Sequence, residues 1–150
     1  MNLQSEWVVG FVDGEGCFHV AINKHHEMTS GFQVLPEFTV VRHKRDVKIL
    51  HALKAFFKCG VVRKNHGERM SYRARNLEHL TTIILPFFEK HSLKTLKRVD
   101  FIKFRTVVLM MNQKKHLTLD GFEKIKSIKE QMNRSKLRYS PAFSETEEIN

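Results

Sequence analysis

The spacing of hydrophobic residues changes twice in the N-terminal half of the chain. Residues 5–14 are nearly all apolar and predict a buried helix with Ser5 as its N-cap. From Cys17 onward apolar and polar residues alternate, first over residues 17–23 and again over residues 32–40. Because a period of two places all apolar side chains on one face, these segments predict a long β-hairpin with one face in the core.

The middle of the chain repeats this order of helix and hairpin. Asp46 predicts the N-cap of a helix with an apolar stripe, and Gly60 predicts its end. A second hairpin follows, in which residues 61–65 and 70–75 flank a short turn at Gly67.

The remainder of the chain is helical in pattern. Asn76 is a suitable N-cap for a helix that Pro86 should kink or end. Two more helical patterns cover residues 94–112 and 119–132.

The predicted order is αββαββ followed by helices, which defines an α+β fold. The strands should form one antiparallel sheet with the helices packed on one face. We expect a single domain over residues 1–132, which a chain of 150 residues can fold around one core. Residues 133–150 are expected to be a flexible C-terminal tail or extension.

The sheet face away from the helices should carry mostly polar, net basic side chains. The expected DNA-facing positions are His19, Ala21, Asn23, His25, Gln33, Glu37, Thr39, Val61, Arg63, Asn65, Ser71, Arg73 and Arg75. Such a strand surface suits a DNA groove. The alternative is an ordinary solvated face, since exposed strand positions are polar in any antiparallel sheet.

The net charge favours a polyanionic partner. The formal charge is +10 at pH 7, and residues 133–150 contain three basic and three acidic residues, so the excess belongs to the predicted domain. Nucleic acid suits this charge better than a membrane, because no segment has the large apolar face of an interfacial helix and no apolar run approaches the ~18 residues of a membrane span. A basic surface without any partner remains the alternative.

The segment VVGFVDGEG, residues 8–16, departs from the composition of an ordinary helix. Gly10 and Gly14 lie one turn apart. Glycine inside a helix costs up to about 1 kcal/mol relative to alanine, but such a pair lets a second helix approach closely. Glu15 lies at the helix C-terminus, where the macrodipole disfavours a carboxylate.

A twofold pairing of this helix would bring two Glu15 carboxylates together. Like charges in a partly dry site require a cation between them. Carboxylate oxygens, with the Gly14 carbonyl nearby, suit Mg²⁺, which would polarise a phosphate and activate water for phosphodiester hydrolysis. The alternative left open by the residues is a solvent-exposed glutamate at a tight glycine turn.

VVGFVDGEG resembles the LAGLIDADG motif of homing endonucleases. The likeness continues through CFHVAI, through residues 38–80 beginning FTVVRHKRDV, and through PFFEKHSLKTLKRVDFIKF, so that it covers residues 7–112. It is greatest with single-motif, homodimeric members encoded by mobile introns in rRNA genes, especially of algal organelles. The resemblance implies an αββαββα fold whose four-stranded antiparallel sheet is saddle-shaped.

The resemblance also implies roles for single residues. The family's metal-binding acidic residue corresponds to Glu15, and the carbonyl of Gly14 faces the metal, whereas Asp13 is expected to be structural. Lys94 matches the active-site lysine, which would stabilise charge developing on the phosphate. Arg42 stands where members commonly have a glutamine that orders solvent; a guanidinium there would hold a phosphate directly, or slow or retune cleavage.

With one motif in the sequence, the resemblance implies a homodimer, with Trp7, Gly10, Phe11 and Gly14 at the interface. Two such domains side by side span about 22 base pairs, so the expected target is long, nearly palindromic double-stranded DNA. The implied reaction cuts both strands across the minor groove and leaves short 3′ overhangs. Its expected cofactor is Mg²⁺, with Mn²⁺ able to substitute and Ca²⁺ supporting binding without turnover.

Two other functions remain open at this stage, an RNA maturase that assists splicing of its intron and a non-catalytic DNA-binding regulator. Glu15 and Lys94 together speak against the regulator. Two cysteines without a C-x-x-C pair favour a reducing compartment, and the N-terminus lacks a signal or transit pattern. We therefore expect a protein made and acting in a chloroplast or mitochondrion, or otherwise in a bacterial cytoplasm.

Overall fold

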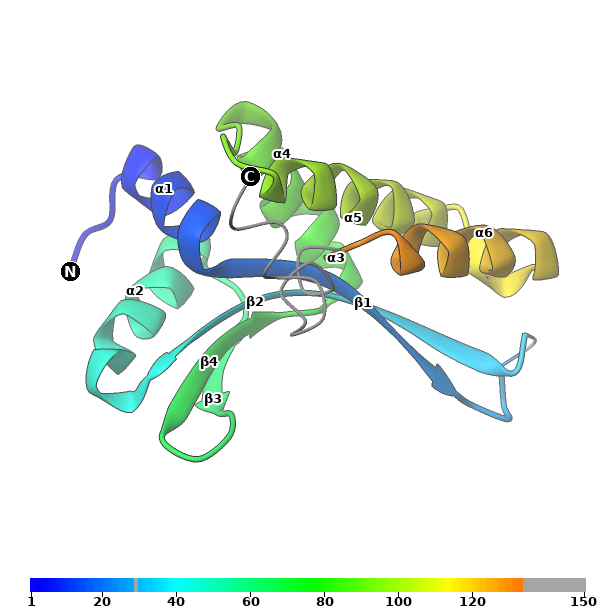
Figure 1. Cartoon of the computed structure of the whole chain (residues 1–150), viewed down its shortest axis with the longest axis horizontal. Helices are drawn as coiled ribbons and strands as arrows, with labels where there is room; N and C mark the ends of the chain where they lie inside the picture. The colour runs from blue at the N-terminus through cyan, green and yellow to red at the C-terminus, as the bar shows by residue number, and fades with distance from the viewer. Residues whose placement is uncertain (29, 134–150) are drawn as a thin grey trace, which may run out of the picture.

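A computed structural model describes residues 1–28 and 30–133 (Figure 1). In chain order, the elements are α1 (Ser5–Glu15), β1 (Gly16–Lys24), β2 (Phe32–His43), η1 (Lys44–Asp46), α2 (Val47–Phe57), β3 (Val61–Lys64), β4 (Arg69–Ala74), α3 (Leu77–His79), η2 (Leu80–Ile84), α4 (Leu85–Lys90), α5 (Lys97–Asn112), η3 (Lys115–Leu117) and α6 (Leu119–Glu130). The predicted α+β class and the order αββαββ followed by helices are confirmed.

The four strands form one antiparallel sheet in the order β1-β2-β4-β3. Phe18 pairs with Phe38 across the first hairpin, and Val40 pairs with Tyr72 where β2 meets β4. In Figure 1 the β1–β2 hairpin extends to the lower right while β3 and β4 run to the lower left, so the sheet arches beneath the helices. Among residues 1–28 and 30–133, no helix covers the lower face of the arch.

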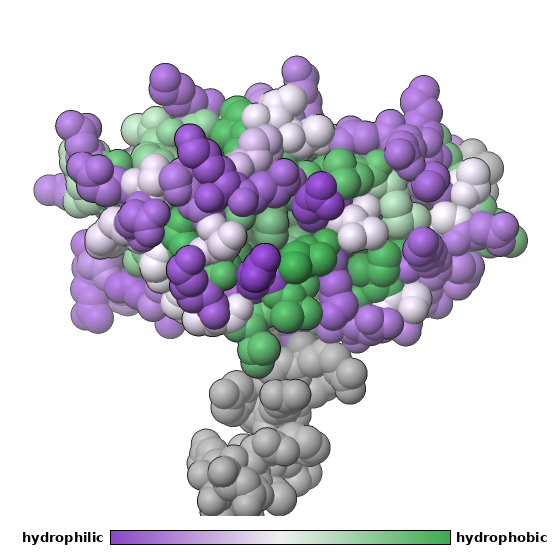
Figure 2. All heavy atoms as spheres, turned by 90° about the horizontal axis from the view of Figure 1, so that it is seen from above, coloured by the Kyte–Doolittle hydropathy of each residue, from purple (hydrophilic) through white to green (hydrophobic). Residues whose placement is uncertain are grey.

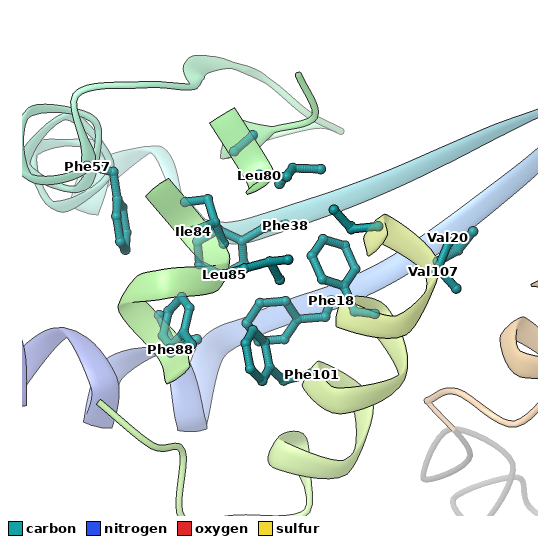
Figure 3. Packing of buried hydrophobic residues seen from close by; sticks show 14 of the residues in the cluster. Phe18, Val20, Phe38, Phe57, Leu80, Ile84, Leu85, Phe88, Phe101 and Val107 are labelled. Carbon is teal, nitrogen blue, oxygen red and sulfur yellow. The ribbon is translucent and has the colours of Figure 1, made fainter. Parts of the chain in front are cut away.

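Aromatic side chains fill the space between the sheet and the helices (Figure 3). The ring of Phe18 stacks on that of Phe38 at a centroid distance of 4.9 Å. The rings of Phe88 on α4 and Phe101 on α5 meet Phe18 edge-on at 5.4 Å and 5.2 Å. Such edge-to-face and offset arrangements are favoured by the ring quadrupoles and add to the hydrophobic stabilisation.

Helices α2 and α6 pack on the same face of the sheet. Phe57 of α2 meets Phe38 at 5.9 Å, and Phe122 of α6 stacks on Phe32 at 4.9 Å. The predicted core positions of the strands, which alternate with the polar ones, are therefore the positions that the helices cover. The packing of helices on one face of the sheet is confirmed.

Helix α1 differs from the prediction at its start and in its burial. Gln4 occupies the N-cap position and Ser5 is the first helical residue, so the prediction that Ser5 is the cap is wrong. Val8, Val9 and Val12 face the core. The opposite side of the helix points to solvent, with Trp7 45% exposed, so the prediction of a buried helix is wrong for this face.

The C-terminal end of α2 also differs from the prediction. Lys58 adopts the left-handed conformation at the C-cap of α2 (φ 60°), two residues before the predicted stop at Gly60. Gly60 is also left-handed (φ +88°), and a Cβ there would lie 2.7 Å from the Tyr72 ring, so packing as well as backbone conformation requires glycine.

Pro86 does not end its helix. Asn76 caps α3 as predicted, with its Oδ1 accepting a hydrogen bond from the backbone N–H of His79 at 3.0 Å. The chain then continues through the π-helical η2 into α4, with the N–H of Leu85 donating to the carbonyl of Leu80. The wider π turn comes directly before the proline, where a regular α-helix would clash with the ring.

The predicted C-terminal tail begins at a residue that is bound to the domain. The N–H of Asn133 donates to Asp100 Oδ1 at 2.9 Å, and its side-chain amide donates to the Phe18 carbonyl at 3.1 Å. The rest of that prediction, residues 134–150, lies outside the described residues.

Candidate active site and nucleic-acid interface

Glu15 lies at the point where helix α1 turns directly into strand β1. A Cβ on the next residue, Gly16, would lie 2.7 Å from Val12 Cγ1 and 3.0 Å from the Val12 carbonyl oxygen, so only glycine fits this turn. The tight turn leaves the Glu15 side chain at the end of the sheet, 45% exposed. Its carboxylate is available to solvent ions and to a ligand on the open side.

Arg42, near the end of β2, binds this carboxylate. Its Nη1 lies 3.0 Å from Glu15 Oε1, and its Nη2 lies 2.8 Å from Asp46 Oδ2. The guanidinium carbon also lies 5.9 Å from the ring centroid of Phe11 on α1, within cation–π range. Asp46 occupies the N-cap position of α2 as predicted, but its carboxylate holds Arg42. Arg42 therefore bridges two carboxylates.

Lys97, the first residue of α5, is the lysine whose ammonium group approaches the end of α1. Its Nζ donates a hydrogen bond of 3.2 Å to the carbonyl of Val12. Burial lowers the pKa of Lys97, and nearby anionic groups, Glu15 among them, partly oppose that effect. A half-buried lysine with a perturbed pKa beside a carboxylate is a typical feature of functional sites.

Lys94, the lysine expected from the sequence, takes part through its backbone. Its N–H donates to Asp13 Oδ2 at 2.7 Å, while its side chain is exposed. The catalytic role of Lys94 stays a prediction. The lysine side chain that contacts the end of α1 is that of Lys97.

Asp13 joins the end of α1 to the start of α5. Its Oδ1 accepts hydrogen bonds from the N–H and the hydroxyl of Thr95, at 3.2 Å and 2.8 Å. Burial alone would raise the pKa of Asp13, but these bonds, the bond from Lys94 and the charge of Lys97 together lower it. The carboxylate thus fixes the turn that places Lys97, in agreement with the structural role expected for Asp13.

The donor set at Glu15 fits a hard divalent cation only in part. Among residues 1–28 and 30–133, no group of three or more His, Cys, Asp or Glu side chains could hold a metal ion. Mg²⁺ in nucleic-acid enzymes is bound through one or two carboxylates together with phosphate oxygens rather than by a protein cage. The exposed Glu15 carboxylate and the exposed Gly14 fit such a site if a second carboxylate or a phosphate completes it.

The strand register places most of the predicted DNA-facing residues on the open face of the sheet. These are His19, Ala21, Asn23, Gln33, Glu37, Thr39, Val61, Arg63, Ser71 and Arg73, whose side chains alternate with those in the core. His25, Asn65 and Arg75 each lie one residue beyond a strand, and the N–H of His25 donates across the hairpin to the carbonyl of Gly31. The face contains a concavity of about 790 Å³, to which Val41, Cys17 and Lys129 also contribute; these three residues were not among the predicted DNA-facing positions.

Glu37 organises the basic side chains at the centre of this face. Its carboxylate lies 3.3 Å from Arg73 Nε, 3.9 Å from Arg75 Nε and 3.5 Å from His19 Nε2. Burial, followed by repulsion from Arg75, lowers the pKa of Arg73, and Glu37 opposes this effect. Glu37 therefore balances part of a positive cluster on the open face.

A second, smaller concavity of about 380 Å³ lies at the β3 edge of the sheet. Three arginines, Arg63, Arg73 and Arg75, line it together with His79. The positive charge of the open face thus extends to its edge, where a polyanion lying across the sheet would pass.

The solvent-facing side of α1 carries two neighbouring aromatic residues, Trp7 and Phe11. The rings of Trp7 and Phe11 stack at a centroid distance of 4.8 Å. A Cβ added at Gly10 or at Gly14 would meet no heavy atom within 4 Å among the described residues, so packing in this domain does not require either glycine. Figure 2, which views the helix side, shows apolar side chains gathered between polar ones on the surface. The predicted interface residues of α1 are accessible for a helix from another copy.

Within the described part of the chain, none of the helices is both long and apolar enough to span a membrane.

Comparison with known proteins agrees with the fold. Residues 8–108 match the family model described as LAGLIDADG endonuclease. The chain therefore belongs to the LAGLIDADG endonuclease family. A curated relative is probable intron-encoded endonuclease 2 of Neurospora crassa, 28% identical over 82% of this chain and 26% of that protein. The chain spans about a quarter of the length of the first curated relatives that it matches.

Two solved structures have the same fold. The homing endonuclease I-TnaI is 53% identical, with a TM-score of 0.86 over 89% of this chain and 90% of that chain. The LAGLIDADG homing endonuclease I-SmaMI bound to an uncleaved DNA target with calcium ions is 42% identical, with a TM-score of 0.87 over 89% of this chain and 46% of that chain. I-SmaMI has also been solved bound to cleaved DNA.

Proposed function

We propose that this chain is a site-specific homing endonuclease that acts as a homodimer on a long, nearly palindromic DNA target and hydrolyses one phosphodiester bond in each strand with Mg²⁺. The observation that carries the proposal is the position of Glu15. Glu15 is the last residue of α1, the helix that exposes Trp7 to solvent. Its carboxylate is paired with Arg42 and lies in the field of Lys97, at the end of the sheet whose open face is basic. Family membership and the DNA-bound I-SmaMI structures support the same activity.

The residues at this site divide the work of phosphodiester hydrolysis. Glu15 and the Gly14 carbonyl would hold Mg²⁺, which supplies Lewis-acid stabilisation of the phosphate and a more acidic bound water. Lys97 provides a fixed positive charge near the reacting phosphate, where it would stabilise charge developing on the phosphate oxygens. Arg42 is held by Asp46 at the rim of the same site and is placed to contact an adjacent phosphate.

The open face would bind the duplex on either side of the scissile bonds. Arg63, Arg73 and Arg75 are suited to phosphates or to guanine edges, which accept two hydrogen bonds from a guanidinium. Two copies joined through α1 would extend this face over about 22 base pairs. The equivalence of the two copies explains why the target should be nearly palindromic.

The homodimer part of the proposal is supported by α1. Its exposed Trp7 and Phe11, together with the two unhindered glycines, form a surface suited to a second copy of the same helix. The pairing would bring the two Glu15 carboxylates together and supply the second carboxylate that the metal site lacks in one domain. Two relatives are named as probable intron-encoded endonucleases and a third as a protein in ND4 intron 1, which supports an origin in an intron. Synthesis in an organelle is part of the proposal.

The first experiment selects bound duplexes from a random library in Ca²⁺, followed by addition of Mg²⁺ and sequencing of the ends. We expect a nearly palindromic site of about 22 base pairs, cut once per strand with a fixed 3′ stagger. Glu15→Gln should abolish cutting and leave selection intact, because it removes a metal ligand but no phosphate contact. Glu89→Gln, which alters another exposed glutamate paired with an arginine, is the matched control.

Each other outcome points to a different function. Tight, selective duplex binding without cutting would indicate a DNA-binding regulator. A protein that selects no duplex, but stimulates splicing of an intron RNA independently of Glu15, would be a maturase.

A further inference from the structure

The Glu15 carboxylate already has a cation beside it, which is supplied by the protein. Arg42 Nη1 lies 3.0 Å from Glu15 Oε1, one of the two carboxylate oxygens with which Glu15 would bind a metal ion. The two side chains are about one third and slightly less than half exposed, so water and ions reach the pair. Arg42 and a divalent cation are therefore competitors for one carboxylate.

We propose that Arg42 is an internal counter-cation of Glu15 that a divalent cation must displace, and that Arg42 thereby sets the metal concentration at which the site fills. This inference rests on the proposed function in one respect, the assignment of Glu15 as a metal ligand.

Asp46 would keep the Arg42 side chain close to Glu15 after a metal ion displaces it. Arg42 Nη2 donates to Asp46 Oδ2 at 2.8 Å, and the guanidinium lies against the Phe11 ring. A guanidinium has five N–H donors, so Arg42 can release Glu15 without losing its other two contacts. It would remain beside the site after a metal ion binds, and it would return to Glu15 when the ion leaves.

The second cation at the site does not compete in this way. Lys97 Nζ donates to the carbonyl of Val12 and acts on Glu15 only through the electric field. Removal of Lys97 would change the electrostatic potential at Glu15, but Arg42 would still bind Glu15 Oε1. The competition is thus specific to Arg42.

The size of the effect follows from the exposure of the pair. Exposed ion pairs shift a competing equilibrium by up to about five-fold, because solvent screens them and side-chain ordering opposes them. We therefore expect Arg42→Gln to bind a divalent cation about five-fold more tightly than the unaltered protein.

The test is a Mn²⁺ titration of the DNA-free full-length protein, followed by electron paramagnetic resonance of the free ion. Arg42→Gln should lower the Mn²⁺ dissociation constant about five-fold, and Glu15→Gln should remove the site with or without Arg42. Arg105→Gln is the matched control, since Arg105 forms a similar exposed pair with Glu89, 2.8 Å apart, and its loss changes the total charge equally. Arg45→Gln removes a nearby exposed charge that is not paired with Glu15.

The outcomes separate the inference from the function on which it rests. An unchanged dissociation constant in Arg42→Gln, or an equal gain in Arg45→Gln or Arg105→Gln, would overturn the counter-cation, while loss of the site in Glu15→Gln would still support Glu15 as the ligand. If Mn²⁺ binding is the same with and without Glu15, the counter-cation is overturned. If the result is the same when a selected duplex supplies phosphate oxygens, Glu15 as a metal ligand is overturned as well. A protein that binds Mn²⁺ as expected but cuts no DNA supports the counter-cation and contradicts the endonuclease.

Discussion

Two carboxylates separated by one glycine at the end of α1 have different tasks. Asp13 accepts hydrogen bonds from the turn before α5, and these bonds hold its pKa below the ordinary value. Glu15 points to the open end of the sheet and is paired with Arg42. At the residue scale the site thus consists of a structural acid that positions Lys97 and a partly exposed acid that is paired with Arg42.

Lys97 and Lys94 provide a matched pair for testing which lysine acts in catalysis. Lys97→Met should lower the single-turnover rate of DNA cleavage about 100-fold or more, because it removes a positive charge fixed beside the reacting phosphate. Lys94→Met should change the rate little, since the exposed side chain is screened and its backbone contact with Asp13 persists. The opposite result would support the lysine expected from the sequence. DNA affinity in Ca²⁺ should be measured for both variants.

Asp13 should make the stability of the domain depend on acid pH. A carboxyl group whose pKa is lower in the folded state stabilises the fold above its unfolded pKa of about 3.9 and loses that contribution as the pH falls through the folded value. Asp13→Asn should therefore cost roughly 1 kcal/mol of unfolding free energy at pH 7, similar to the loss of a helix cap, and less below pH ~4. Urea unfolding at several pH values measures this, and a difference independent of pH would contradict it.

At the scale of elements, α1 is built with two different kinds of glycine. Gly16 is required inside the domain, because any Cβ would collide with Val12. Gly10 and Gly14 have open space around them among the described residues, so packing within this domain requires a glycine at neither position. Sequence spacing singled out Gly10 and Gly14, but only the structure shows why residue 16 is a glycine.

This distinction predicts opposite effects for two substitutions. Gly10→Leu should keep or raise the unfolding free energy, by up to about 1 kcal/mol from helix propensity, and convert the dimer to a monomer. Gly16→Ala should lower the melting temperature. Sedimentation equilibrium and thermal unfolding test both, and a dimeric Gly10→Leu variant would exclude α1 as the interface.

The sheet was the most predictable element, because alternating residues have only two faces to occupy. Phe18 and Phe38, which were expected in the core, are fully buried, and most of the expected DNA-facing residues share the open face. Helix ends were less predictable, since tertiary contacts decide them. The end of α2 illustrates this, as Lys58 adopts the left-handed conformation two residues before the predicted stop at Gly60.

At the scale of the whole molecule, a net charge of +10 combines with an open sheet face lined by arginines. DNA affinity should fall steeply with salt, with a slope of log K against log[salt] of roughly −0.9 per phosphate contact. Arg63→Gln should reduce the magnitude of the slope by about one if Arg63 contacts a phosphate. Arg105→Gln, on α5 and paired with Glu89, should leave it unchanged. Fluorescence anisotropy at 50–200 mM salt measures these slopes, and equal changes in both variants would contradict this placement.

The sequence by itself determined the α+β class, the order of elements, the faces of the sheet and the position of Glu15 at the end of its helix, because these depend on local periodicity and on a contiguous motif. Only the tertiary structure decided which cations stand beside Glu15. Arg42 and Lys97 are far from Glu15 along the chain, and their approach depends on the pairing of β1 with β2 and on the turn held by Asp13. Local pattern determines which way a side chain faces in its own element, whereas packing between elements determines what that side chain meets.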